Sequence, residues 1–211
     1  MKYLQILFAA CFGAILLLNP NPALAKKPYA GADAGYLVYS VSSLGMPMIF
    51  SFDYHRTPAD AEPKLEGSLD CRCQGLLVML YPGKMDYKGV DHSDEHGNVS
   101  VEKLPPGQYE VYSFVVTSGS MAYGGTWTPK KQFSMPFTIQ AGQATYIGNF
   151  ARRCCGDNDH GHMGLGYFVI SDKSDRDLAI ARTKEPALPP VTDQVFDVTK
   201  LDLPNVFSSE P

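Results

Sequence analysis

The sequence predicts an all-β protein: an antiparallel β-sandwich of about seven or eight strands with one short helix near the C-terminus. Three observations lead to this prediction. Short segments of alternating apolar and polar residues recur along the chain, tight turns separate them, and loop-forming residues are abundant, with 16 Pro and 19 Gly in 211 residues. This combination is typical of a loop-rich sheet protein rather than a helical one.

The clearest pattern is a pair of turns and strands that follows residue 94. Gly97-Asn98 and Pro106-Gly107 favour chain reversal, because Gly and Asn tolerate the backbone angles of tight turns and Pro presets the first turn position. Val99 and Val101 share one face of the short strand between these turns. The segment therefore predicts a hairpin.

The strand that follows, 108–117, is the longest expected. Its two faces alternate, with Tyr109, Val111, Ser113 and Val115 opposed by Glu110, Tyr112, Phe114 and Val116. We expect Tyr109, Val111 and Val115 to point into one core together with Leu76. Leu76 belongs to segment 74–81, which is apolar on both faces and therefore predicts a central strand.

The other elements follow from the same criteria. Segments 55–67, 82–96 and 118–131 are polar or Gly-rich and are predicted to be loops. The further predicted strands are 36–41, 48–54, 133–139, 144–150 and 165–171.

One helix is predicted to begin at Ser174 and to end before Pro186. Ser174 is a suitable cap, and Asp175 and Asp177 favour the positive N-terminal end of a helix. Residues 185–211 are rich in Pro and polar residues, which predicts a tail that is disordered or lies along the surface. The predicted organisation is a linker at 26–34, a β-sandwich domain at 35–184 and this tail.

The hairpin region also carries a resemblance to a known family. A turn ending in Gly, a short strand and then Leu104-Pro105-Pro106-Gly107-Gln108-Tyr109 resembles the carboxypeptidase-regulatory-like, prealbumin-type β-sandwich module. The later run 133–178 is similar to bacterial envelope proteins and lipoproteins. The resemblance implies a binding or structural module, and it supplies no catalytic residue.

Residues 1–25 are expected to be a signal peptide that is removed. Lys2 precedes an apolar run at 3–18, and Ala23-Leu24-Ala25 provides small residues for cleavage before Lys26. An uncleaved anchor and lipid attachment at Cys11 are the alternatives. Cleavage predicts a periplasmic or extracellular protein with no membrane span in the mature chain.

The charge balance gives no indication of a basic nucleic-acid-binding surface. Without Lys2, 17 of the 18 basic residues remain against 22 acidic ones, a net charge of −5 with His neutral. We therefore expect a protein or small ligand as partner rather than nucleic acid or an anionic lipid surface.

Four cysteines follow the leader: Cys71, Cys73, Cys154 and Cys155. In an exported protein an even number of cysteines first indicates disulfides. Adjacent Cys154 and Cys155 have Cα atoms only about 3.8 Å apart, below the usual disulfide range, which favours cross-pairing of Cys71 and Cys73 with Cys154 and Cys155. One such bond closes a long loop and stabilises by roughly 4 kcal/mol, whereas a second bond beside it closes almost no new loop.

Because loop closure accounts for one disulfide better than for two, a metal site is the alternative. His160 and His162 closely follow Cys154 and Cys155, and sulfur with imidazole suits copper(I) or zinc. The spacing matches no standard ligand signature. Free or mixed thiols are a third possibility.

Other motifs favour ordinary structural roles. His92 to His96 fits the His-x-x-Glu-His pattern of some metalloproteases, but the nearby glycines oppose the helix that this chemistry needs, so a solvated polar loop is expected. The aromatic residues Tyr112, Tyr123 and Trp127 are expected to pack in the core or in loops rather than to form a binding surface.

Together these observations predict a non-enzymatic exported envelope protein that is structural or binds a ligand or partner. The loops 82–96, 118–131 and 151–164 would present the binding surface. The alternative function is metal binding or handling, with copper or zinc, through Cys154, Cys155, His160 and His162.

Overall fold

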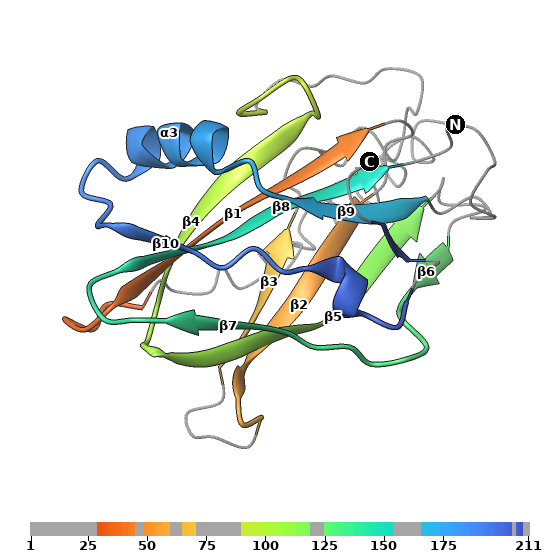
Figure 1. Cartoon of the computed structure of the whole chain (residues 1–211), viewed down its shortest axis with the longest axis horizontal. Helices are drawn as coiled ribbons and strands as arrows, with labels where there is room; N and C mark the ends of the chain where they lie inside the picture. Colours follow the sequence, from red (N-terminus) through yellow and green to blue (C-terminus); the bar gives the residue numbers. More distant parts are fainter. Residues whose placement is uncertain are drawn as a thin grey trace, which may run out of the picture.

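The computed structural model describes residues 29–44, 49–59, 65–70, 90–118, 125–153, 166–203 and 206–208. Within these residues the chain forms strands in two sheets, one α-helix and one 3-10 turn (Figure 1). Their bounds are β1 Gly35–Leu44, β2 Ile49–Thr57, β3 Glu66–Asp70, β4 Gly97–Leu104, β5 Gly107–Ser118, β6 Gly125–Trp127, β7 Met135–Ile139, β8 Ala144–Arg153, β9 Tyr167–Ser171, α3 Ser174–Lys184, β10 Val191–Asp193, η1 Val198–Lys200 and β11 Phe207–Ser208. The prediction of an all-β chain with one short helix is confirmed.

The strands form two sheets. The first, here sheet A, has the order β11-β9-β8-β1-β4, and β10 also pairs with β8. The second, sheet B, has the order β3-β2-β5-β6, and β7 also pairs with β5. Among the described strands, β4 therefore lies at one end of sheet A.

Purely antiparallel pairing, which the sequence predicted, does not hold for sheet A. Strand β1 pairs with β8 in parallel, as do β10 with β8 and β11 with β9. Between β1 and β8 the chain forms β4 and all the strands of sheet B, and this long connection permits a parallel pair. The short strands of the C-terminal segment add the other two.

Side chains from both sheets form one hydrophobic core. Phe52 of β2 lies at its centre, with ring centroids 4.7 Å from Phe168 and 5.0 Å from Phe150, both on sheet A. Phe114 of β5 packs 5.2 Å from Phe168. These rings are almost completely buried, and each large apolar side chain removed from water contributes about 1.5–3 kcal/mol.

A β-bulge in β5 changes which residues reach this core. Tyr109 and Val111 are buried as predicted, but Val115 is only partly buried, while Phe114 and Val116 are buried instead. On the partner strand Asp53 pairs with Ser113 and Tyr54 with Val111, which leaves Tyr112 as an extra residue. An extra residue shifts the alternation by one position, so the prediction for Val115 is wrong. Leu76 lies outside the described residues.

Several predicted loops contain strands. Strand β2 continues to Thr57 and β3 begins at Glu66, within the segment expected to be a loop, and β6 lies in the Gly-rich segment. The expected central strand at 74–81 lies outside the described residues. The strands within predicted loops carry polar side chains on the outer face of sheet B, so their sequences there have few of the apolar residues by which strands were predicted.

The helix forms where it was predicted, but its start is stabilised differently. Ser174 is its first residue rather than its cap, and the carboxylate of Asp172 accepts a hydrogen bond from the Ser174 amide at 2.8 Å. Helix α3 lies across the outer face of β4, β1 and β8 (Figure 1). Its Ala181 is completely buried against Val38 and Tyr146 of that sheet. None of the described helices is long and apolar enough to cross a membrane.

The segment after the helix is not a loose tail over its described residues. It adds β10 to the start of β8 and β11 to β9. Phe207 is buried in the core with a ring centroid 5.3 Å from Phe133, and Val198 is also buried. A few apolar residues in a Pro-rich segment are sufficient to hold it against the sheets.

Candidate functional site

The residues first expected to carry chemistry lie outside the described part of the chain. These are the disulfide candidates Cys71, Cys73, Cys154 and Cys155 and the metal candidates Cys154, Cys155, His160 and His162. Among the residues that the structure does describe, no group of three His, Cys, Asp or Glu side chains is placed to hold a metal ion. Disulfide pairing and metal binding therefore stay predictions from the sequence.

The segment with the His-x-x-Glu-His pattern is a tight turn, as expected, but it is not a solvated loop. His92 forms a β-bridge with Gly97, so no helix places both imidazoles on one face. His92 and Glu95 are only 8% and 6% exposed. The expectation of a solvated segment is wrong at these positions, because the turn folds over the end of sheet A beneath the first turn of α3.

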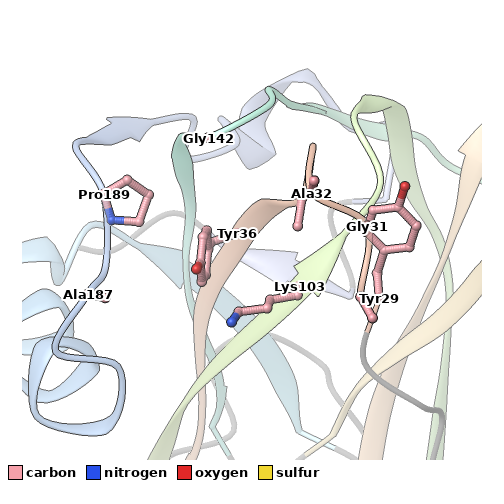
Figure 2. A pocket seen from close by; sticks show the side chains of 10 residues that line it. Tyr29, Gly31, Ala32, Tyr36, Lys103, Gly142, Ala187 and Pro189 are labelled. Atoms are coloured by element: carbon pink, nitrogen blue, oxygen red, sulfur yellow. The ribbon is translucent and has the colours of Figure 1, made fainter.

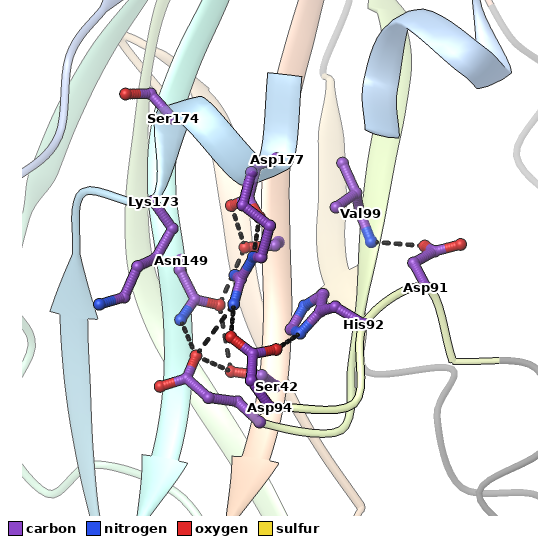
Figure 3. Close-up of polar contacts among 12 residues, drawn as sticks. Ser42, Asp91, His92, Asp94, Val99, Asn149, Lys173, Ser174 and Asp177 are labelled. Atoms are coloured by element: carbon purple, nitrogen blue, oxygen red, sulfur yellow. Dashed lines mark hydrogen bonds and ion pairs between the residues drawn. The ribbon is translucent and has the colours of Figure 1, made fainter. Parts of the chain in front are cut away.

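Glu95 belongs to a group of polar side chains between sheet A, this turn and α3 (Figure 3). We call this group the α3 polar cluster. It comprises residues of β1, β8, the turn and the helix: Ser40, Ser42, Tyr146, Asn149, Arg153, His92, Asp94, Glu95, Arg176 and Asp177.

Asn149 joins the strands to the turn. Its side-chain nitrogen donates a hydrogen bond to Glu95 at 2.7 Å, and its side-chain oxygen accepts one from Ser42 at 3.1 Å. Ser40 lies on its other side, 2.9 Å from the same oxygen. All three strand residues are fully buried, so these contacts replace the water that each polar group loses.

Asp177 joins the helix to the strands. One of its carboxylate oxygens accepts hydrogen bonds from the Tyr146 hydroxyl, at 2.7 Å, and from Ser40. The other accepts from the Arg176 Nε at 2.8 Å. The Tyr146 hydroxyl in turn accepts a bond from the Lys173 amide at 3.2 Å. Burial, and then the negative charge of Asp177, raise the pKa of Tyr146, so the hydroxyl keeps its proton.

A bulge in β8 brings Tyr146 and Asn149 to the same face. Val38 pairs with Tyr146 but Ser40 pairs with Asn149, so β8 contains one more residue than β1 across this interval. Gly148 has a φ of 109°, which a residue with a side chain rarely adopts. With regular alternation residues 146 and 149 would face opposite sides, and only the bulge places both under α3.

Two arginines balance the carboxylates. Arg153 donates to Glu95 at 2.8 Å, and Arg176 donates to Asp94 at 2.8 Å. Burial opposes the ionisation of Asp94, but hydrogen bonds from Arg176 and His92 outweigh it and lower the pKa of Asp94 to about 2. Burial alone would lower the pKa of Arg176. Its hydrogen bonds and charge interactions with Asp177 and Asp94 outweigh this effect and raise the pKa.

Ser42, His92 and Asp94 are the residue types of a nucleophilic triad, but their contacts differ from one. The His92 Nδ1 lies 2.7 Å from Asp94, as an oriented histidine would. Ser42, however, is fully buried and donates to Asn149, and the His92 Nε2 has no hydrogen-bond partner among the described residues. A nucleophile must reach substrate and its base. The cluster therefore holds α3 and the turn against the sheet.

A more open feature lies at the opposite end of β1 and β4 (Figure 2). This groove, which we call the Tyr36 groove, has a volume of about 560 Å³. Most of its lining residues have small side chains, and the lining consists of Tyr29, Ala30, Gly31, Ala32, Ala34, Tyr36, Lys103, Gly142, Ala187 and Pro189.

The polar groups of the Tyr36 groove are few. The Lys103 ammonium lies 5.2 Å from the centre of the Tyr36 ring and 3.8 Å from Glu185. The Lys103 side chain is 41% exposed, and Figure 2 shows it extending from β4 toward Tyr36. Tyr29, on the other side of the groove, donates to Asp33 at 2.7 Å. The groove thus combines an aromatic face with one cation and one nearby carboxylate.

The predicted aromatic positions have different surroundings. The Tyr112 ring packs at a tilt against the His55 ring, with ring centroids 4.4 Å apart. Trp127 is 36% exposed and is the exposed large hydrophobic side chain of the described residues. Tyr123 lies outside them. The expectation that these aromatic residues pack against other side chains therefore fits Tyr112 better than Trp127.

Sequence reasoning missed both features. Ser40, Ser42 and Asn149 were a usable signal for the cluster, because polar residues inside otherwise apolar strands need partners when buried. The Tyr36 groove has no comparable signal, since its walls are mostly Gly, Ala and Pro from distant segments.

No protein-family model and no curated protein matches the chain. Among solved structures, a leucine-rich repeat protein from Bacteroides thetaiotaomicron is similar over 58% of this chain, with 13% sequence identity and a TM-score of 0.32. The chain spans about 14% of the length of that structure. A TM-score this low shows no shared fold.

Proposed function

We propose that this chain is an exported, non-enzymatic β-protein that binds a small ligand of the cell envelope in the Tyr36 groove. The observation behind this proposal is the groove itself. Its volume of about 560 Å³ lies within the range of small-molecule sites, roughly 300–1,000 Å³. It is open, and it places one aromatic ring beside one cation.

The lining suggests how a ligand would be held. The Tyr36 ring offers a flat apolar surface, and the Lys103 ammonium beside it offers a charged hydrogen-bond donor. Glu185, 3.8 Å from Lys103, adds an acceptor. A ligand with a flat or extended apolar side and a carboxylate or several hydroxyl groups fits these partners, and soluble disaccharide-peptide fragments of a bacterial cell wall have both properties.

The contacts of the α3 polar cluster support a non-enzymatic role. Its serine, histidine and carboxylates are the described residues that most resemble catalytic groups. Ser42 and Asn149 are fully buried, and their hydrogen bonds are made to one another and to Glu95. These groups stabilise the fold where they are, which leaves binding in an open groove as the better supported activity.

Export rests on the leader-like residues 1–25, and the sandwich assignment on the resemblance of the hairpin to carboxypeptidase-regulatory-like modules. The mature protein is expected to begin at Lys26. N-terminal sequencing of protein recovered from the exported fraction tests this, and a lipid-modified start at Cys11 would replace the soluble form with an anchored one.

Calorimetric titration with purified cell-wall disaccharide-peptides tests the binding function. We expect saturable binding that Tyr36→Ala and Lys103→Ala each weaken by roughly tenfold, because each removes one of the two main contacts. Trp127→Ala is the matched control, since it removes an exposed aromatic outside the groove. The absence of saturable binding, or equal losses in all three variants, would contradict the proposal.

A further inference from the structure

Two charged side chains cover part of the outer edge of β4. Strand β4 pairs with β1 on one side and is the last strand of sheet A among the residues that the structure describes. In an antiparallel pair, every second residue turns its amide and carbonyl away from the partner strand. On β4 these are Gly97, Val99, Val101 and Lys103, since backbone groups of Gly97, Val99 and Lys103 bond to partners outside β1. Such an edge is a template for another strand.

Val99 is capped on both of its outward groups. Its amide donates to the Asp91 carboxylate at 2.7 Å, and its carbonyl accepts from the Lys184 ammonium at 2.6 Å. Asp91 and Lys184 also form an ion pair with each other. An acceptor and a donor therefore stand where the carbonyl and amide of a neighbouring strand would be. We call this pair the β4 cap.

The two ends of the β4 edge are also closed. The Gly97 carbonyl accepts from the Asp91 amide at 2.9 Å, and the Lys103 carbonyl accepts from the Tyr29 amide at 3.3 Å. Between them, the outward amide and carbonyl of Val101 have no hydrogen-bond partner in the part of the chain that the structure describes. A groove of about 390 Å³ follows the edge here, lined by Asp91, Lys184 and residues 98–102.

The same solution closes a second strand. The outward amide of Thr138 on β7 donates to the Gln194 side-chain oxygen at 2.8 Å, and its carbonyl accepts from Thr145 at 2.8 Å. Side chains thus replace a missing strand at two separate places. Strand β4 is the longer of the two, with eight residues against five, and so it is the larger template.

We propose that the Asp91–Lys184 cap keeps β4 from pairing with the β4 strand of a second copy of this chain. A second copy is the fitting partner because a two-fold antiparallel pair is self-complementary, so each outward amide meets an outward carbonyl. The β-branched Val99 and Val101 suit such a pair. The cap interrupts the edge at Val99. The remaining open residue, Val101, is by itself too short to pair with another strand.

Sedimentation velocity over a concentration series tests this proposal with the purified protein. The variant Asp91→Ala/Lys184→Met removes both cap groups. We expect it to self-associate roughly tenfold more tightly than the unaltered protein, since it exposes a further donor and acceptor on the edge. The matched control is Lys131→Met/Asp202→Ala, which removes another surface ion pair that bonds no strand edge.

A third substitution shows whether β4 is the contact. Val101→Pro removes only an outward amide, and proline is tolerated at such edge positions, so adding it should return the uncapped variant to a monomer. The proposal is overturned if the uncapped variant remains monomeric with an unchanged circular dichroism spectrum, or if its association survives Val101→Pro. If the double variant does not fold, Lys184→Met alone should associate to a smaller degree, and a monomer there also overturns it.

Discussion

The Tyr146 hydroxyl donates a 2.7 Å hydrogen bond to the carboxylate of Asp177 and so ties β8 to the first turns of α3. The Asp177 carboxyl group is completely buried, and its other oxygen accepts from Arg176. A buried carboxylate is tolerated only when donors surround it. This relationship explains how a helix with little apolar surface stays on the sheet.

Asp177→Asn is therefore expected to destabilise the protein by about 3–5 kcal/mol, the range for breaking a buried charged pair. The amide group would point a donor at either Arg176 or Tyr146, which are themselves donors. Urea unfolding followed by circular dichroism measures the effect. Asp175→Asn, on the exposed side of the same turn, is the control and should cost less than about 1 kcal/mol. Equal losses would show that the helix dipole, rather than the cluster, accounts for the effect.

Gly97→Ala is expected to destabilise by about 1–3 kcal/mol because no space exists for a Cβ atom. A Cβ there would lie 2.5 Å from the His92 ring and 2.6 Å from the Cβ of Ser42. Thermal or urea unfolding measures the loss. His92→Ala should relieve part of it, so the double variant should be more stable than the sum of the two single effects predicts. If the two effects on stability simply add, the Cβ atom of Gly97→Ala does not clash with the His92 ring, and the strain arises from another contact.

The Asp94 carboxylate is expected to make the free energy of unfolding depend on pH in the acid range. Its folded pKa of about 2 lies below the ordinary value of 3.8, so its stabilising contribution is fully present above about pH 4 and is lost as the pH falls toward 2. The side chain is 58% exposed, so solvent screening keeps the contribution below about 1 kcal/mol.

Urea unfolding between pH 2 and 6 checks this expectation. Asp94→Asn should lower stability slightly at pH 6 and should flatten the pH dependence between pH 4 and 2. Asp202→Asn provides a comparison, because Asp202 bonds an exposed lysine at the surface. An unchanged pH profile in Asp94→Asn would show that other carboxylates account for the acid sensitivity.

The cysteines are expected to be paired across the chain, Cys71 and Cys73 with Cys154 and Cys155. Protein prepared under native redox conditions should show no free thiols with or without chelator, and reduction should lower its melting temperature by several degrees or more. Thiols that chelator releases, with loss of stability, would instead support copper or zinc bound through Cys154, Cys155, His160 and His162. Replacing His160 and His162 by Ala separates the two outcomes, since only a metal site needs them.

The sequence by itself determined the class of the fold and the place of most elements. Alternating residues in β1, β5 and β8 and the turn at Pro106-Gly107 are local signals, because strand periodicity and turn chemistry depend on neighbours in the chain. The helix after Lys173 was equally local. These elements agree with their predicted positions to within a few residues.

The tertiary structure decided which faces those elements bury. One extra residue at Tyr112 turned Phe114 rather than Val115 into the core, and another at Gly148 brought Asn149 beneath α3. A bulge depends on how two strands pair, which a single strand's sequence does not record. The α3 polar cluster, the Tyr36 groove and the β4 cap all join residues far apart in the chain. Their partners became evident only after β8 had returned beside β1 and α3 had packed across the sheet.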